Sequence, residues 1–197
     1  LSKVSVIEGD VVDLDPVEMA KNPLLEGVNV VFHCAADVNL GQDPTGRTFR
    51  INYQGSKNIV ELAKLLKVKE LHYVGTAYIA GRLVGRAIED NPIDSGFNNP
   101  YEESKYKAEM LVRNSGIPFS IYRPSIITGR RSDGRIRKPL AFYRILEFLG
   151  KLKSHRCSKL GVPHVQPVNL GINFATIPSE HVYFVPIDYV QEAITAL

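Results

Sequence analysis

The sequence predicts an α/β fold, a doubly wound parallel sheet. Short apolar runs rich in β-branched residues recur along the chain without clean polar alternation, as expected of strands buried on both faces. Segments with helical spacing of apolar residues separate them, so strand and helix alternate, and such units build parallel sheets with right-handed crossovers. The predicted strands of this sheet cover residues 4–8, 28–34, 71–75 and 117–122.

Two helices are predicted between these strands. In the first, apolar residues between Phe49 and Leu66 repeat at intervals of three, four and seven residues, which is the period of one helix face. The second helix covers residues 101–114 and ends at Ser115-Gly116, a helix-stop signal that is followed by Pro118.

The pattern loosens after Arg123-Pro124. A loop rich in Gly and Arg precedes a predicted helix over residues 140–152, and a stretch containing Pro and Gly covers residues 161–178. A last strand is predicted over residues 181–187, and Asp188 is expected to cap the helix that follows it.

The length of 197 residues and the 44% apolar content are enough for one principal domain with a substantial core. No apolar run approaches the roughly 20 residues that span a bilayer, and the first residues lack the order of a signal peptide. Two cysteines, Cys34 and Cys157, are too few for a disulfide scaffold. We therefore expect a soluble cytoplasmic protein.

The net charge of +3 conceals a basic region. Residues 130–159 hold ten Lys and Arg against Asp133 and Glu147, a local charge of +8 that leaves −5 elsewhere. Such a region suits a phosphate-bearing ligand or an acidic protein, and a solvated loop is the plain alternative. It lacks the interleaved aromatic residues of a nucleic-acid surface. His155, Cys157 and His164 lack the paired spacing of zinc ligands, so no metal is predicted.

Three residues suggest carbonyl chemistry. Tyr101 and Lys105 are four apart on a predicted helix, which places both side chains on one face about 6 Å apart. An ammonium at that distance lowers the pKa of a phenol, and such a phenol can give a proton to a carbonyl oxygen. Thr76 ends a predicted strand, where a doubly wound sheet opens its ligand crevice, and its hydroxyl can bind the same oxygen.

Each of these residues also has a plain structural interpretation. Lys105 could be an exposed lysine paired with Glu102 or Glu109, as Lys107 is expected to be on another side of the helix. The Thr76 hydroxyl could bind the turn that follows it. His33, inside an apolar strand, is predicted to be a satisfied core histidine.

Four landmarks appear in a fixed order: Glu8-Gly9-Asp10, Phe32-His33-Cys34-Ala35-Ala36, Gly75-Thr76-Ala77-Tyr78, and the Tyr-x-x-x-Lys run from Tyr101 to Lys105. On these residues the chain resembles the extended short-chain dehydrogenase/reductase superfamily over nearly its whole length. The segments 123–129, 132–134 and 185–190 resemble its thioester and fatty acyl reductase branch, the NAD-binding, male-sterility type.

The resemblance implies a Rossmann-like fold, NADP as cofactor with NAD as the alternative, and the catalytic residues Thr76, Tyr101 and Lys105. The cofactor contacts that it implies are Asp10, Val11, Ala35, Ala36, Asn52, Gly75, Tyr101, Lys105, Pro124, Ser125 and Ile126. Asp10 and Val11 would lie by the adenine, and Ala35-Ala36 would let the dinucleotide pass close to the backbone. Asp10 as a turn residue, Ala35-Ala36 as tight packing and Asn52 as a buried structural amide are equally simple interpretations.

A dinucleotide-binding sheet usually begins with a strand and a glycine-rich turn that holds the pyrophosphate. This sequence has no such turn and opens on what resembles a third strand, so we expect a fragment or an incomplete cofactor site. The predicted division is a partial NAD(P)-binding domain over residues 1–129 and 181–197, with a substrate-side segment over residues 130–180.

The leading hypothesis is an NAD(P)H-dependent reductase of a thioester or related carbonyl. Arg130, Arg131, Arg135, Arg137 and Lys138 would then attract the phosphates of coenzyme A or of a phosphopantetheine arm, which belongs to a separate carrier protein or to the same multidomain chain. A sugar-nucleotide epimerase or dehydratase uses the same Tyr/Lys/Thr core and is the first alternative. A non-catalytic dinucleotide-binding or scaffold domain is the second.

Overall fold

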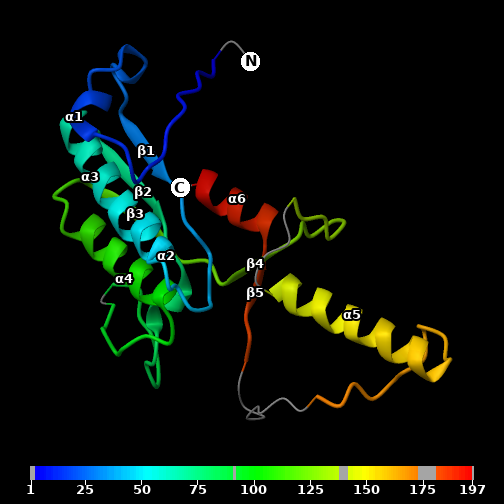
Figure 1. The fold of residues 1–197 in the computed structure, drawn as a ribbon. Helices are drawn as coiled ribbons and strands as arrows, with labels where there is room; N and C mark the ends of the chain where they lie inside the picture. The colour runs from blue at the N-terminus through cyan, green and yellow to red at the C-terminus, as the bar shows by residue number, and fades with distance from the viewer. Residues whose placement is uncertain (1–2, 91, 138–141, 173–180, 197) are drawn as a thin grey trace. The chain divides into compact units, whose positions relative to one another are not determined.

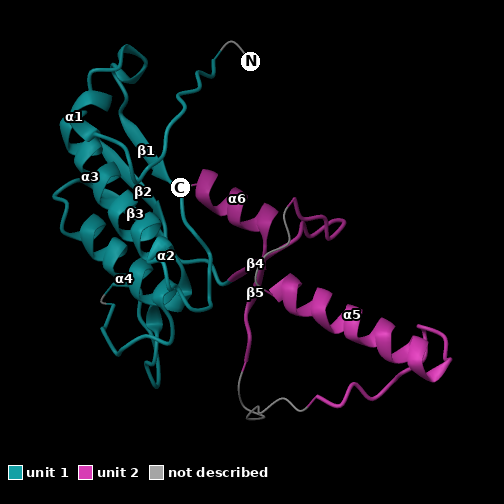
Figure 2. Ribbon diagram, in the orientation of Figure 1, with its two compact units in different colours: residues 1–125 teal, residues 126–197 magenta. Residues whose placement is uncertain are grey.

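The computed structural model describes residues 3–90, 92–137, 142–172 and 181–196. It divides into two compact units, residues 1–125 and residues 126–197 (Figure 2). Each unit is described by itself. The predicted functional division at residues 129/130 and 180/181 stays a prediction.

The first unit is built on a three-stranded parallel sheet with the order β1-β2-β3. The strands are β1 (Val30–His33), β2 (Glu70–Val74) and β3 (Phe119–Tyr122). Their register pairs Val31 with Leu71 and Tyr73 with Ile121. Helices α3 (Gly55–Leu65) and α4 (Pro100–Arg113) form the two crossovers and pack against each other beside the sheet (Figure 1). The predicted parallel α/β fold is confirmed.

The core of this unit lies between the sheet and these two helices. Its buried cluster joins Leu71 and Tyr73 of β2 to Val60 of α3 and to Ala108 and Val112 of α4. Tyr73, Ala108 and Val112 are fully buried. Because successive strand residues face opposite ways, Leu71 and Tyr73 share the face that meets the helices.

The predicted strand over residues 4–8 does not form. Val4 and Val6 are 73% and 80% exposed, and no strand pairs with this segment among the described residues. A strand must satisfy its backbone N–H and C=O groups on a neighbour, and apolar β-branched residues cannot supply that neighbour by themselves. Short helices follow instead: α1 (Pro16–Met19) and the 3₁₀ turn η1 (Pro23–Leu25).

The first predicted helix is confirmed, with one irregular turn. It begins as α2 (Arg47–Phe49), passes through the π-helical turn η2 (Arg50–Gln54) and continues as α3. Glycine is needed at the start of α3 because a Cβ on Gly55 would lie 2.8 Å from Cγ2 of Val11. Nδ2 of Asn58 donates to the carbonyls of Val11 and Val12, at 2.9 and 3.0 Å, and holds that segment against the helix.

Helix α4 is fixed at its start by Asn99 and Glu102. Oδ1 of Asn99 accepts a hydrogen bond from the Glu102 backbone N–H at 3.0 Å, and the Glu102 carboxylate accepts from Nδ2 of Asn99 at 3.1 Å. Such reciprocal capping, with Pro100 in the first turn, satisfies backbone groups that a helix start leaves unpaired. The predicted stop is confirmed, with Gly116 at φ 77°.

The second unit contains a two-stranded parallel sheet of β4 (Ile126–Thr128) and β5 (Phe184–Pro186) and the helices α5 (Phe142–Leu160) and α6 (Ile187–Thr195). Helix α5 runs eight residues beyond the predicted end, because good helix formers continue up to Gly161 at φ 65°. Residues 173–178 of the predicted loop lie outside the described residues.

The predicted cap at Asp188 is wrong. Strand β5 runs directly into α6, so the cap position falls on Pro186, which has no side-chain acceptor. Asp188 lies in the first helical turn instead, and both carboxylate oxygens accept from the backbone N–H of Arg131 at 3.1 Å. No helix in the described parts of the chain combines the length and apolar character needed to cross a bilayer.

Candidate active site

The structure brings the three predicted catalytic residues together at the carboxyl end of β2. Thr76 follows this strand, and Tyr101 and Lys105 lie in the first two turns of α4. Their exposed fractions are 4%, 7% and 2%. The Thr76 side chain lies near enough to the Tyr101 phenol to lower its pKa. The Lys105 ammonium donates to the carbonyl of Val74 at 2.8 Å, two residues before the threonine.

Thr76 also begins the 3₁₀ turn η3 (Ala77–Ala80), which places its side chain. Oγ1 accepts a hydrogen bond from the backbone N–H of Tyr78 at 3.2 Å. The hydrogen bond between the Thr76 hydroxyl and the following turn is therefore present, and the hydroxyl oxygen acts in it as the acceptor. The hydroxyl hydrogen is left for an oxygen placed beside the phenol.

The pKa of Tyr101 is raised, which corrects the predicted lowering by Lys105. Burial is the main cause, the Thr76 side chain opposes it, and the nearby Tyr78 adds to it. Lys105 is not among the groups that shift this pKa, and its ammonium donates to the Val74 carbonyl. A phenol with a raised pKa keeps its proton at neutral pH, so Tyr101 is ready to act as an acid.

Lys105 is a buried lysine rather than a surface one. Burial lowers the pKa of its ammonium from 10.5 to about 8, although Glu109 and Cys34 act in the opposite direction. Its Nζ also lies 4.3 Å from the centre of the Tyr73 ring. The alternative of an exposed ion pair does not hold for Lys105, whereas Lys107 pairs with Glu103 at 2.6 Å as expected.

A polar link that sequence reasoning missed connects Tyr101 to the segment after β1. Nδ2 of Asn52, in the π-helical turn, donates to Oγ of Ser104 at 3.0 Å and to the carbonyl of Asp37 at 3.1 Å. Oδ1 of Asn52 accepts from the Asp37 N–H at 2.8 Å, and the Ser104 hydroxyl donates to the Tyr101 carbonyl at 2.9 Å. The serine directly before Lys105 was the available signal.

Glu109 lies one turn beyond Lys105 on α4 and forms a buried ion cluster. Its carboxylate, 0% exposed, accepts from Nε of Arg113 at 2.8 Å and from Nε and Nη2 of Arg123 at 3.0 and 2.5 Å. The two guanidinium groups also bind the backbone carbonyls of residues 88–90. The cluster thus ties the catalytic helix, the end of β3 and the 88–90 loop together. Nothing in the sequence pattern pairs these distant residues.

The residues predicted to contact the cofactor lie mainly in the first unit. Ala35 and Ala36 are exposed just beyond β1. Gly75 is buried, and a Cβ at this position would lie 3.2 Å from the Tyr122 carbonyl oxygen. Asp10 is a turn residue whose Oδ1 accepts from the Val12 N–H at 2.8 Å. The remaining positions are Val11, Asn52, Pro124 and Ser125 in the first unit and Ile126 in β4 of the second.

Two predictions concern the role of histidine side chains. His33 is buried, its Nε2 lies 2.8 Å from Oγ of Ser56, and burial lowers its pKa to about 4, so it is the satisfied neutral core histidine that was predicted. His155, Cys157 and His164 were predicted not to bind metal. Over the described residues no group of three or more His, Cys, Asp or Glu side chains is arranged to hold a metal ion.

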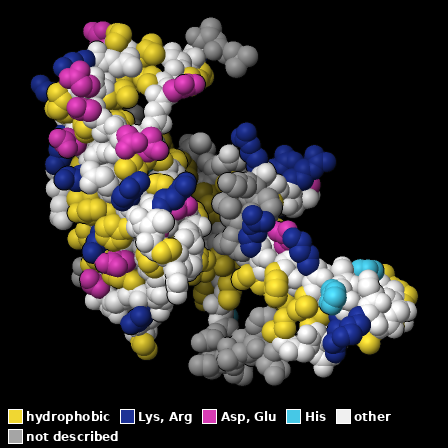
Figure 3. All heavy atoms as spheres, in the orientation of Figure 1, with side chains coloured by type: hydrophobic (Ala, Val, Ile, Leu, Met, Phe, Trp, Pro, Cys, Tyr) yellow, Lys and Arg dark blue, Asp and Glu magenta, His cyan; other side chains and the backbone are white. Residues whose placement is uncertain are grey.

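The basic loop lies in the second unit. Arg130, Arg131, Arg135 and Arg137 are exposed, and Lys138 lies outside the described residues. Asp133 pairs with Arg130 and Arg135, and Glu192 lies 3.6 Å from Arg131, so part of the charge is compensated. Lys and Arg side chains gather on the visible surface of this unit (Figure 3).

Comparison with known proteins identifies the family. Residues 1–194 match the family model described as male sterility protein, a NAD-binding domain. The chain belongs to this family. The predicted resemblance to the reductase branch of the extended short-chain dehydrogenase/reductase superfamily is confirmed.

Three similar proteins are 25–30% identical to the chain over their aligned residues. Aldehyde reductase lnbA of Aspergillus flavus is 30% identical over 190 residues, which cover 88% of this chain and 16% of the relative. The solved terminal R domain of the myxalamid PKS-NRPS biosynthetic pathway is 29% identical with a TM-score of 0.69, covering 96% of this chain and 45% of that one. A thiolation-reductase di-domain from an archaeal non-ribosomal peptide synthetase is 25% identical with a TM-score of 0.69, covering 97% and 39%.

The chain spans about one sixth of the length of lnbA and of two other curated relatives. What the complete relatives act on therefore bears on this chain only through its own residues.

Proposed function

We propose that this chain supplies the catalytic residues of an NAD(P)H-dependent reductase that acts on a thioester or a related carbonyl. The convergence of Thr76, Tyr101 and Lys105 carries the proposal. A phenol that keeps its proton, a hydroxyl near it and a buried amine occupy the carboxyl end of β2, where parallel α/β sheets bind ligands.

The chain's residues have separate tasks in the reduction. The Thr76 hydroxyl and the Tyr101 phenol hold the carbonyl oxygen, and Tyr101 gives it a proton as negative charge develops there. A bound reduced nicotinamide supplies the hydride. The product from a thioester is a hemithioacetal, which releases an aldehyde and a thiol.

The residues present fit a nicotinamide nucleotide. Ala35 and Ala36 are small, exposed and placed just after β1, so a flat ligand can approach the backbone. Lys105 uses one N–H on Val74 and has two others for ribose hydroxyls. We infer NADPH as the preferred reductant because of the likeness to reductases, with NADH as the alternative.

The substrate that fits best is an acyl group carried as a thioester on coenzyme A or on a carrier protein of the same multidomain chain. The likeness to a thiolation-reductase di-domain supports a carrier. Exposed arginines at 130, 131, 135 and 137, with Lys138, would bind the phosphates of either carrier. The two free cysteines favour a reducing compartment such as the cytoplasm.

The test measures oxidation of NADPH and of NADH with acyl thioesters in the full-length protein that contains this chain. Tyr101→Phe is expected to lower the rate at least about 100-fold, because proton donation is lost. Tyr106→Phe is the matched control, since it removes a phenol from the same helix at a half-buried position where the ring centre lies 5.2 Å from that of Phe97. Full activity of Tyr101→Phe would contradict the assignment, and turnover without net nicotinamide consumption would favour an epimerase.

A further inference from the structure

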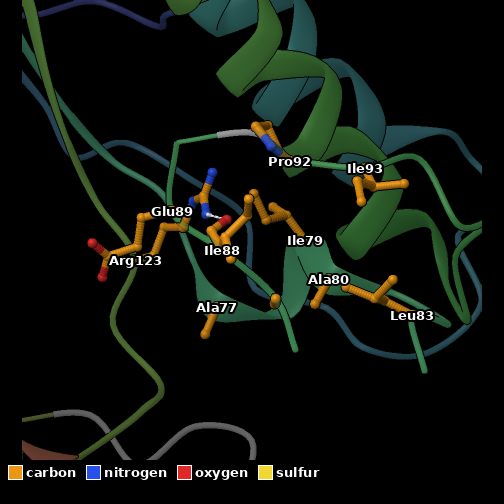
Figure 4. Close-up of a pocket in the computed structure, with 10 residues that line it drawn as sticks. Ala77, Ile79, Ala80, Leu83, Ile88, Glu89, Pro92, Ile93 and Arg123 are labelled. Carbon is orange, nitrogen blue, oxygen red and sulfur yellow. Dashed lines mark hydrogen bonds between the residues drawn. The ribbon is translucent and has the colours of Figure 1, made fainter. Parts of the chain in front are cut away.

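A cavity of about 170 Å³ lies beside the candidate active site, within the first unit (Figure 4). Its lining is mainly Ala, Ile, Leu and Pro side chains from η3 and from residues 83–93. Ile88 and Ile93, which are 47% and 50% exposed, stand on the residue 83–93 side. Exposed apolar side chains around a hollow are typical of a ligand site.

The cavity is close to the residue that would hold the carbonyl oxygen. Ala77, Ile79 and Ala80 of η3 line it, and Thr76 caps that same turn. A 3₁₀ helix rises about 2 Å per residue, so these side chains start within about 8 Å of Thr76 along the turn. An acyl group whose oxygen is bound by Thr76 has its carbon chain within reach of the cavity.

The charges at the cavity disfavour an anionic occupant. Arg123 lines it, but Nε and Nη2 of this side chain bind the buried Glu109 carboxylate, and Nη1 donates to the Ile88 carbonyl at 3.2 Å, the bond drawn in Figure 4. The other charged lining residue is Glu89. An acid and an already paired arginine do not attract an anion, and the rest of the lining is mainly apolar.

We propose that this cavity receives the apolar side chain of the acyl substrate, a phenyl or branched alkyl group of about six carbons. The size follows from volume, since an apolar cavity of about 150 Å³ takes up benzene. The inference rests on the proposed reductase function. It makes residues 77–93 the part of the chain that selects the acyl group.

The experiment compares kcat/KM for the coenzyme A thioesters of acetate and phenylacetate in the full-length protein. Ala80→Leu fills the cavity and is expected to lower the phenylacetyl/acetyl ratio at least about 10-fold, as pocket contacts of one or two methylenes do. Ile93→Ala enlarges the cavity and is expected to raise the ratio for a larger ring, naphthylacetate over acetate. Val84→Leu, at a 96% exposed position outside the lining, is the matched control.

The ratio of two substrates is insensitive to a general loss of folded enzyme. If Ala80→Leu does not fold, Ile93→Ala decides alone. Ratios that stay within twofold of wild type in every folded variant overturn the cavity assignment and leave the reductase proposal standing. Absence of reduction with every thioester in the wild-type protein overturns both.

Discussion

Replacing Lys105 by methionine is expected to stabilise the fold at neutral pH while it removes the proposed activity. Burial lowers the pKa of this amine from 10.5 to about 8. That difference means that a charged Lys105 destabilises the folded state by roughly 3 kcal/mol. Methionine fills a similar space without a charge. The lost hydrogen bond to the Val74 carbonyl costs about 1 kcal/mol, so a net gain of about 2 kcal/mol remains at pH 7.

The sign depends on pH. Below about pH 8 the amine is charged in both folded and unfolded chains, and the fold bears the whole burial penalty. Between about 8 and 10.5 the unfolded chain holds the proton and the folded chain does not, so wild-type stability rises with pH. The stability of Lys105→Met relative to wild type should therefore fall by roughly 2–3 kcal/mol between about pH 7 and pH 10, which is enough to cancel the gain.

Urea denaturation of wild type and variant across about pH 7 to pH 10 measures this difference, and the contributions of groups that do not interact with Lys105 cancel. Lys107→Met is the matched control, because that lysine is exposed and pairs with Glu103, and its effect should stay within about 0.5 kcal/mol at every pH. A Lys105→Met difference that is constant across the pH range would refute the buried-amine argument.

Three further predictions concern the supports of the site. Ser104→Ala removes the partner of a buried Asn52 N–H, so we expect a stability loss of about 1–3 kcal/mol and a lower kcat at unchanged KM. Ser104→Thr should restore most of the stability and of the kcat. A wild-type kcat in Ser104→Ala would exclude a positioning role. Glu109→Gln leaves two partly buried guanidinium groups without a counter-charge and should cost about 3–5 kcal/mol in thermal or urea unfolding, whereas Glu103→Gln, on the surface, should cost less than about 1 kcal/mol; equal losses would contradict the cluster's importance. Gly116→Ala meets only the strain of φ 77° and should cost about 1–2 kcal/mol, whereas a Cβ on Gly81 would also lie 2.2 Å from the Gly96 carbonyl oxygen, so Gly81→Ala should cost clearly more; similar values would mean that the loop can shift.

The sequence predicted those parts of the fold that depend on local pattern. The runs that became β1, β2 and β3 are apolar and β-branched, and the helix carrying Tyr101 has a strong start and stop. Residues 4–8 have the same composition but no strand beside them among the described residues, and composition cannot report a missing neighbour. Asp188 has the chemistry of a cap, but the strand leads into the helix two residues earlier.

The site was predictable as a set of residues and not as an electrostatic arrangement. Spacing alone placed Tyr101 and Lys105 on one face of α4. The direction of the shift in the phenol's pKa is set mainly by burial, which the spacing of the two residues does not reveal, and the ammonium donates to the Val74 backbone carbonyl, which no side-chain pattern predicts. The Ser104 and Glu109 contacts likewise join residues whose meeting is a consequence of the folded chain.

The hydrogen bonds from the guanidinium groups of Arg113 and Arg123 to the 88–90 loop are made to its backbone carbonyl oxygens. Every amino acid has the same backbone carbonyl, so these hydrogen bonds do not depend on which side chains the loop carries. Side chains of the 88–90 loop that line the cavity can thus be substituted while the loop stays hydrogen-bonded to Arg113, on the helix of Tyr101, and to Arg123. Selectivity for new acyl groups could be evolved or engineered at these positions without disturbing the proton donor.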